Sequence, residues 1–235
     1  MTAQTPKREL RYLSPAWILA VGCALAALSA AVNAFFLVRV GTSVSHLTGD
    51  VSRVAVEIAS SHSSLNRGAF HLVAATLSFL LGAAAAGIGI HHQDFGLERP
   101  YGRSISAIGL CLLAAHFLLP KHPVQAIALS AFACGFQNAL ATHYKGIILR
   151  TTHLTGLLTD LGSNIGLRLR GHPIRKRKII VPLLLCVSFF TGAAGGSALV
   201  LGGWGQPLLL LAAAYLGGGL ALGLWKHCAP KSTSP

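Results

Sequence analysis

Long uncharged, apolar runs alternate with polar intervals along this chain. The runs are Ala16–Val38, Ala69–Ile90, Ser104–Leu119, Val124–Thr142, Ile179–Leu201 and Pro207–Trp225. Most reach the ~20 residues that an α-helix needs to cross a ~30 Å hydrocarbon core, at about 1.5 Å per residue. The third run is the shortest, and we expect its helix to tilt or to extend past Tyr101. The pattern therefore predicts six membrane-spanning helices.

The same pattern predicts an all-α, polytopic transmembrane bundle, because no strand-like alternation is sustained and backbone within lipid must be helical or a closed barrel. A basic start before an apolar run also fits a signal peptide cleaved near Ala30. The internal repeat described next argues against cleavage, because its element Asn33-Ala34 would fall at or beyond the cut.

The chain contains the tetrapeptide His-Leu-Thr-Gly twice, at residues 46–49 and 153–156. Each copy follows an apolar run with Asn-Ala close to its end, at residues 33–34 and 138–139, and Phe-x-x-Gly-Ala-Ala occurs at residues 79–84 and 189–194. The offsets of 107, 105 and 110 residues agree to within short insertions. Self-similarity at a fixed period indicates a duplicated unit.

Each half holds three predicted spans, so the second half must enter the membrane from the opposite side. Two such halves form an inverted repeat, which is the plan of many secondary transporters. We expect a tail at residues 1–15, a first membrane repeat at 16–119, a second at 120–225, and a tail at 226–235.

The charge distribution predicts the orientation. The chain is 53% hydrophobic and only 11% charged, whereas about a quarter of residues are charged in ordinary soluble domains. Fifteen of the 19 Lys and Arg residues fall in the tails and intervals that would lie inside if the N-terminus is cytoplasmic. We therefore expect a multi-pass protein of the bacterial inner (cytoplasmic) membrane with both termini cytoplasmic. The net charge of +13 then needs no nucleic-acid partner, and the run 175–178 reads as a cytoplasmic anchor.

Small residues and cysteines add packing expectations. Gly192-x-x-x-Gly196, Gly219-x-x-x-Gly223 and Gly82 with Ala86 are patterns of close helix approach. Four of the five cysteines lie inside apolar runs and no C-x-x-C pair occurs, which favours core residues over disulfides or a metal site.

The repeated motif carries the candidate chemistry. Thr48 and Thr155 are expected to be N-caps of the amphipathic stretches 51–59 and 157–169, with Gly49 and Gly156 allowing close backbone approach. Helix N-termini attract anions, and two of them would face each other near the midplane if the intervals fold back into the membrane. The candidate substrate-binding residues are Asn33, His46, Thr48, Gly49, Asp50, Asn138, His153, Thr155, Gly156 and Asp160.

The motif histidines could titrate near neutral pH and share a proton with the aspartates. The alternative is that they bond a loop carbonyl and that both motifs are cap signals on surface loops. In that case Asp50 serves the helix dipole alone.

Phe136-Gln-Asn-Ala139, the stretch Leu149–Gly156 and Leu158-Thr-Asp-Leu-Gly162 resemble the signature of the YoaK family, bacterial membrane proteins carrying a domain of unknown function (DUF1275). The resemblance covers about residues 16–225. The family usually has an acidic residue where Asn33 stands and Asn where Asp50 stands. If the family uses that first acidic group to carry a proton, the role has moved or been lost here. The resemblance implies the fold and no established activity.

The sequence favours a small-molecule transporter or permease-like protein over a structural or regulatory membrane protein. Its partners would be the lipid bilayer and a small, preferably anionic, solute, while a homo-oligomer stays open. No nucleophile elbow, metal-ligand helix or cofactor loop occurs, so we expect no enzyme activity, cofactor, metal or catalytic residue.

Overall fold

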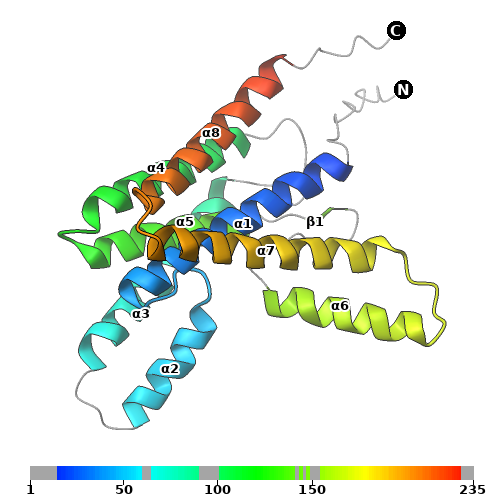
Figure 1. The fold of residues 1–235 in the computed structure, drawn as a ribbon, viewed down its shortest axis with the longest axis horizontal. Helices are drawn as coiled ribbons and strands as arrows, with labels where there is room; N and C mark the ends of the chain where they lie inside the picture. The colour runs from blue at the N-terminus through cyan, green and yellow to red at the C-terminus, as the bar shows by residue number, and fades with distance from the viewer. Residues whose placement is uncertain are drawn as a thin grey trace, which may run out of the picture.

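The computed structural model describes residues 15–59, 65–89, 101–140, 143–144, 147–148 and 154–228, which form eight α-helices and one short strand pair (Figure 1). The helices are α1 (Pro15–Val40), α2 (Leu47–Ala59), α3 (Leu65–Gly89), α4 (Tyr101–Leu118), α5 (Pro123–Leu140), α6 (Leu154–Leu169), α7 (Arg177–Leu201) and α8 (Pro207–Cys228). Strands β1 (His143–Tyr144) and β2 (Ile147–Ile148) pair antiparallel. The predicted all-helical class is confirmed apart from this two-residue ladder.

Five of these helices are long and apolar enough to cross a membrane. They are α1, α3, α4, α7 and α8. The third predicted run begins its helix at Tyr101, as its short length suggested. The fourth run forms α5, which is not among the five because it includes Gln125, Gln137 and Asn138.

The environment of α5 explains its polar residues. Half of its residues are buried, and it packs against both α3 and α4. Because its neighbours shield it, α5 needs less apolar surface than a helix facing lipid. The structure thus has five spans by composition and a sixth long helix enclosed by them.

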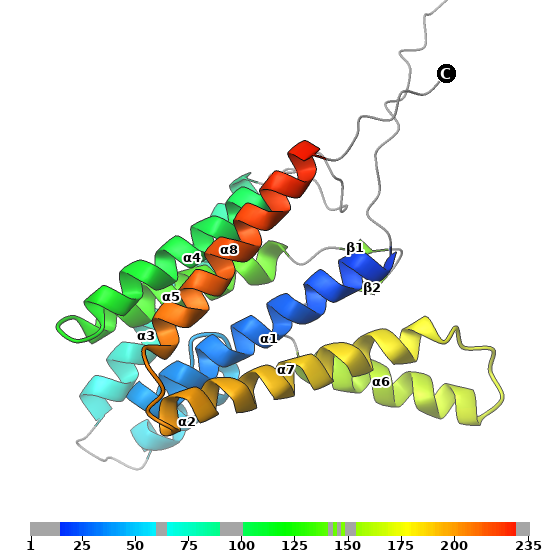
Figure 2. The ribbon, with the colours of Figure 1, turned by 45° about the horizontal axis from the view of Figure 1, so that its top comes forward.

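The long helices pack in pairs that run side by side (Figures 1 and 2). The pairs are α1 with α7, α3 with α5, and α4 with α8. The first turns of α1 and the last turns of α8 lie at one end of the bundle, which we call the terminal end, and the rings of Trp17 and Trp225 are 6.1 Å apart there. The turns 119–122 and 202–206 lie at the opposite, far end.

Glycines allow backbones to touch in each pair. A Cβ at Gly192 would lie 2.1 Å from the carbonyl oxygen of Ala27, and a Cβ at Gly82 would fall equally close to that of Phe132. Gly109 of α4 faces α8 in the same way. The close approach predicted for Gly82 and Gly192 is confirmed, and only glycine fits at these points.

The two short helices lie on opposite parts of the bundle. α2 packs against α3 and extends toward the far end, whereas α6 packs against α7 and extends toward the terminal end (Figure 1). Their first turns face the middle of the molecule. This arrangement brings both motif segments near the centre of α7.

Candidate functional site

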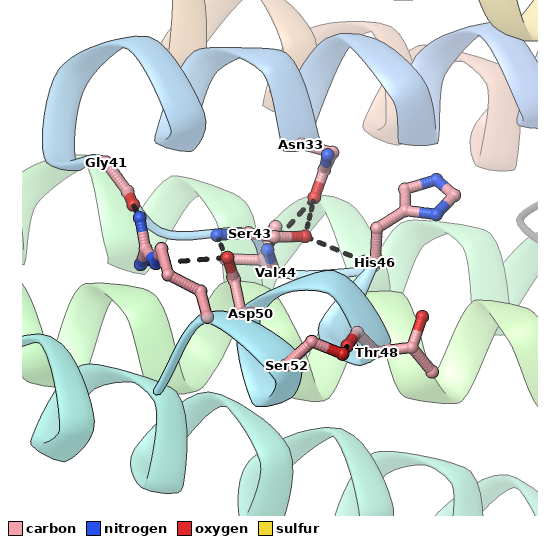
Figure 3. Close-up of polar contacts among 9 residues, drawn as sticks. Asn33, Gly41, Ser43, Val44, His46, Thr48, Asp50 and Ser52 are labelled. Atoms are coloured by element: carbon pink, nitrogen blue, oxygen red, sulfur yellow. Dashed lines mark hydrogen bonds and ion pairs between the residues drawn. The ribbon is translucent and has the colours of Figure 1, made fainter. Parts of the chain in front are cut away.

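Asn33 holds the loop that carries the first motif (Figure 3). Its Oδ1 accepts hydrogen bonds from Ser43 Oγ at 2.8 Å and from the backbone N–H groups of Val44 and Ser45, each at 3.0 Å. Asn33 and Ser43 are buried. An α1 side chain that takes three donors from residues 43–45 fixes the path of the loop 41–46 after the helix ends.

Asp50 fixes the same loop from the other side. Its Oδ2 accepts the N–H of Ser43 at 2.8 Å, and Arg53 lies 3.7 Å from its Oδ1. Arg53 also donates to the carbonyl oxygen of Gly41, which has a φ of +71°. Asp50 is only 8% exposed, so its charge is compensated by Arg53 and by the positive end of α2. The carboxylate of Asp50 therefore stabilises the loop 41–46 as well as the first turn of α2.

The predicted caps are wrong by one turn. α2 begins at Leu47 rather than near residue 51, and α6 begins at Leu154 rather than near residue 157. Thr48 and Thr155 therefore lie inside the first turns, with exposed side chains. The hydroxyl of Ser43 accepts the N–H of His46 at 2.8 Å and does part of the capping at α2. Ser43, near the start of the loop, therefore takes the capping role that the sequence spacing predicted for Thr48.

His46 places the first motif at the depth of the bundle centre. Its ring lies edge-on against Phe189, with centroids 4.9 Å apart and planes at 88°. Phe189 is the middle residue of α7, which spans Arg177–Leu201. The loop 41–46 therefore returns from the end of α1 to the level of the middle residue of α7.

The second motif lies against the neighbouring turn of α7. Leu157 is buried with Val181 and Leu185, four residues before Phe189 and thus about 6 Å along the helix. Thr155, Gly156 and Asp160 are exposed. Of the other predicted site residues, Gly49 is exposed on α2, Asn138 is half-buried on α5, and His153 lies outside the described residues.

Sequence reasoning missed one buried polar cluster. Gln137 donates through Nε2 to the carbonyl oxygen of Leu25 at 2.9 Å and accepts the hydroxyl hydrogen of Tyr215 on its Oε1. These contacts join α5, α1 and α8 inside the bundle. The sequence does show a glutamine within an apolar run. It does not show the hydrogen-bond partners of this glutamine, because they lie 112 and 78 residues away in the chain.

The far end holds a cavity of about 600 Å³. It is bounded by the end of α1, the turn between α4 and α5, and the turn between α7 and α8. Arg39, His116 and Gln206 are among its lining residues, so the rim offers a guanidinium and hydrogen-bonding groups to a solute. None of these residues was singled out from the sequence.

Among the described residues no group of three or more His, Cys, Asp or Glu side chains could hold a metal ion. Cys23, Cys111, Cys134 and Cys186 are all free thiols, and only Cys134 is fully buried. Among the described residues, the chemistry around the motifs is that of helix N-terminal amides, the hydroxyl groups of threonines, the carboxyl groups of Asp50 and Asp160, and the imidazole of His46.

The long apolar helices and their glycine contacts define an integral membrane protein with several spans. Residues 21–222 match the family described as "Protein of unknown function (DUF1275)", and the chain belongs to that family. No curated protein and no solved structure matches the chain.

Proposed function

We propose that the protein is a small-molecule transporter or permease-like protein with six spans in two inverted halves. The main supporting observation is that both motifs lie beside α7. His46 contacts Phe189, and Leu157, which directly follows the second motif, is buried in one cluster with Leu185 where α6 packs against α7. In transporters with broken helices, substrate groups bind where half-helix N-termini meet near the midplane.

The helix contacts support the inverted repeat. If α1, α2, α3 and α4 correspond to α5, α6, α7 and α8, then exchanging the halves converts α1 with α7 into α5 with α3, and α2 with α3 into α6 with α7. The pair α4 with α8 converts into itself. The same exchange relates Gly82 against Phe132 to Gly192 against Ala27, at the sequence offsets of 110 and 105.

The roles within the proposed site differ between residues. Asn33 and Asp50 position the first loop, because their oxygens are occupied by loop donors. The exposed positions are Thr48 and Gly49 on α2, and their counterparts Thr155 and Gly156 on α6. Asp160 of α6 is exposed as well. Exposed hydroxyls and first-turn amides suit a small, anionic solute, since each helix start carries partial positive charge.

The runner-up is a structural or regulatory membrane protein. The observation that favours it is the same bracing of the loop 41–46 by Asn33 and Asp50. A loop built only to be rigid would show these bonds and no water-filled space beside the motif.

Accessibility of single cysteines at Thr48 and Thr155 tests the two functions. In proteoliposomes, transport predicts that both cysteines react with a membrane-impermeant thiol reagent, in a background lacking the five native cysteines. Leu80→Cys, exposed on the apolar surface of α3, is the lipid-facing control. Reaction of Thr48→Cys and Thr155→Cys only with a membrane-permeant maleimide, as for the control, would contradict transport.

Uptake is measured in the same proteoliposomes. A pool of small organic anions is added outside and the trapped contents are identified by mass spectrometry. The proposal predicts accumulation of at least one anion and its loss in Thr48→Val. Equal contents in vesicles with and without protein would favour the runner-up.

A further inference from the structure

A groove of about 410 Å³ runs between α1 and α8. Its α1 wall is Trp17, Val21, Ala24, Leu25 and Leu28, and its other wall is Ala214, Tyr215, Gly218, Ala221, Leu222 and Trp225, with Ile105 of α4. The lining is almost entirely apolar. The hydroxyl group of Tyr215 donates to Gln137, so it is already engaged. The groove therefore suits a hydrocarbon occupant rather than a polar solute.

The length of the groove matches one leaflet of a bilayer. Trp17 to Leu28 and Ala214 to Trp225 each cover twelve residues of helix, and the rise from the first to the last is about 16 Å. Half of a ~30 Å hydrocarbon core is about 15 Å. The groove begins at the terminal end with the Trp17–Trp225 ring pair, and tryptophan favours the membrane–water interface. It thus extends from the headgroup level to about the midplane.

The charge at the terminal end complements a phosphate group. In the sequence, Lys226 directly follows Trp225. α4 also begins at this end, because Gly102 meets the backbone of Gly223, and the side chain of Arg103 in its first turn is exposed. Basic residues at headgroup depth attract anionic lipid groups.

We infer that the α1–α8 groove is a binding site for one acyl chain of a phospholipid from the leaflet at the terminal end. Its phosphate group binds at the exposed side chain of Arg103, in the first turn of α4. An empty groove of this volume would leave Val21, Leu25 and Leu222 without contacts on one side, which is unfavourable. This inference does not depend on transport.

Two neighbouring glycines give a matched test. A side chain at Gly218 would enter the groove, whereas Gly217 is equally exposed and does not line it, and a Cβ at either position meets nothing within 4 Å. Full-length protein is reconstituted with a phosphatidylglycerol that carries a photoactivatable diazirine on its acyl chain. Crosslinked peptides are then mapped by mass spectrometry.

Wild type and Gly217→Leu should be labelled on Val21 and Ala24, and Gly218→Leu should lose this labelling at least fivefold. Circular dichroism spectra that coincide for the three proteins establish that each is folded. Unchanged labelling of Val21 and Ala24 in Gly218→Leu would overturn the inference. A disulfide-linked dimer of Ala221→Cys, without lipid labelling on α1, would also overturn it by showing that a second copy fills the groove.

Discussion

Replacing Gly192 by alanine should force α7 away from α1. The new Cβ would lie 2.1 Å from the oxygen and 2.5 Å from the Cα of Ala27. Backbone atoms cannot escape by changing a rotamer, so the helices must separate by about 1 Å to restore a carbon contact of about 3.5 Å. The separation also disturbs the contact of Gly196 with Ala31. We expect a loss of about 3 kcal/mol in the free energy of unfolding, at the upper end of overpacking effects.

Gly195→Ala is the matched control three residues further along α7. Nothing lies within 4 Å of a Cβ there, so the change should stabilise the helix by about 0.5–1 kcal/mol. At roughly 2–4 °C per kcal/mol, the two variants should melt about 7–16 °C apart. Thermal unfolding in detergent, followed by far-UV circular dichroism, measures the difference. Coincident melting temperatures would mean that α1 and α7 do not meet at Gly192.

Three further predictions follow from the repeat and its orientation. Gly82→Ala should lower the melting temperature as much as Gly192→Ala, and an unchanged value would break the equivalence of the halves. Reporter fusions should read outside after residue 55 and cytoplasmic after residue 175, and a cytoplasmic signal from both would contradict the inverted topology. His46→Cys with His153→Cys, in a background without native cysteines, should join under oxidation or with a short bifunctional reagent, since a disulfide needs Cα atoms within about 7 Å. If the two cysteines react only from opposite sides of the membrane, the two motifs lie on opposite faces and the prediction is wrong.

The spans were predictable because their signal is local. A run such as Pro207–Trp225 must be helical in lipid whatever it packs against, and its structure follows from composition alone. Whether α5 can cross the membrane depends instead on the helices that pack around it. Gln137 lowers its hydropathy, yet this residue bonds to Tyr215 and Leu25 inside the bundle. Such compensation is invisible without the fold.

The starts of α2 and α6 were predictable from the sequence, but the hydrogen bonds of the residues around them were not. The repeated His-Leu-Thr-Gly located the starts of α2 and α6 to within a few residues. Capping propensity favours Thr48, but the hydroxyl group of Ser43 accepts the N–H of His46 and also donates to Asn33, which fixes the loop. Capping preference is a weak force next to a buried side chain that accepts three hydrogen bonds.

The hydrogen bonds of the loop 41–46 predict how this chain tolerates a departure from the pattern that the family resemblance implies. The family resemblance expects an acid at Asn33 and an amide at Asp50, and this chain has the reverse. Asn33 accepts a hydrogen bond from the hydroxyl group of Ser43, and Asp50 accepts one from the backbone N–H of Ser43 (Figure 3). Exchanging acid and amide therefore keeps one carboxylate and one carboxamide on the same loop.

A double-mutant cycle tests this exchange. Asn33→Asp alone would keep an acceptor for the loop donors but place two carboxylates around Ser43, and we expect it to lose about 1–2 kcal/mol of stability. Asp50→Asn alone would keep an acceptor for the N–H of Ser43 and lose the ion pair with Arg53, a loss of about 1 kcal/mol or less because Arg53 is half exposed.

The double variant Asn33→Asp with Asp50→Asn should recover most of the first loss. The coupling energy between the two sites should then be about 1–2 kcal/mol, within the range of residues that share a partner. Melting curves of the four proteins in one detergent give the cycle. Additive effects would show that the two carboxyl positions do not sense each other, and the exchange between Asn33 and Asp50 would then have no explanation in the loop. Recovery in the double variant would instead show that residue 33 can hold the acid and residue 50 the amide while the loop keeps its geometry.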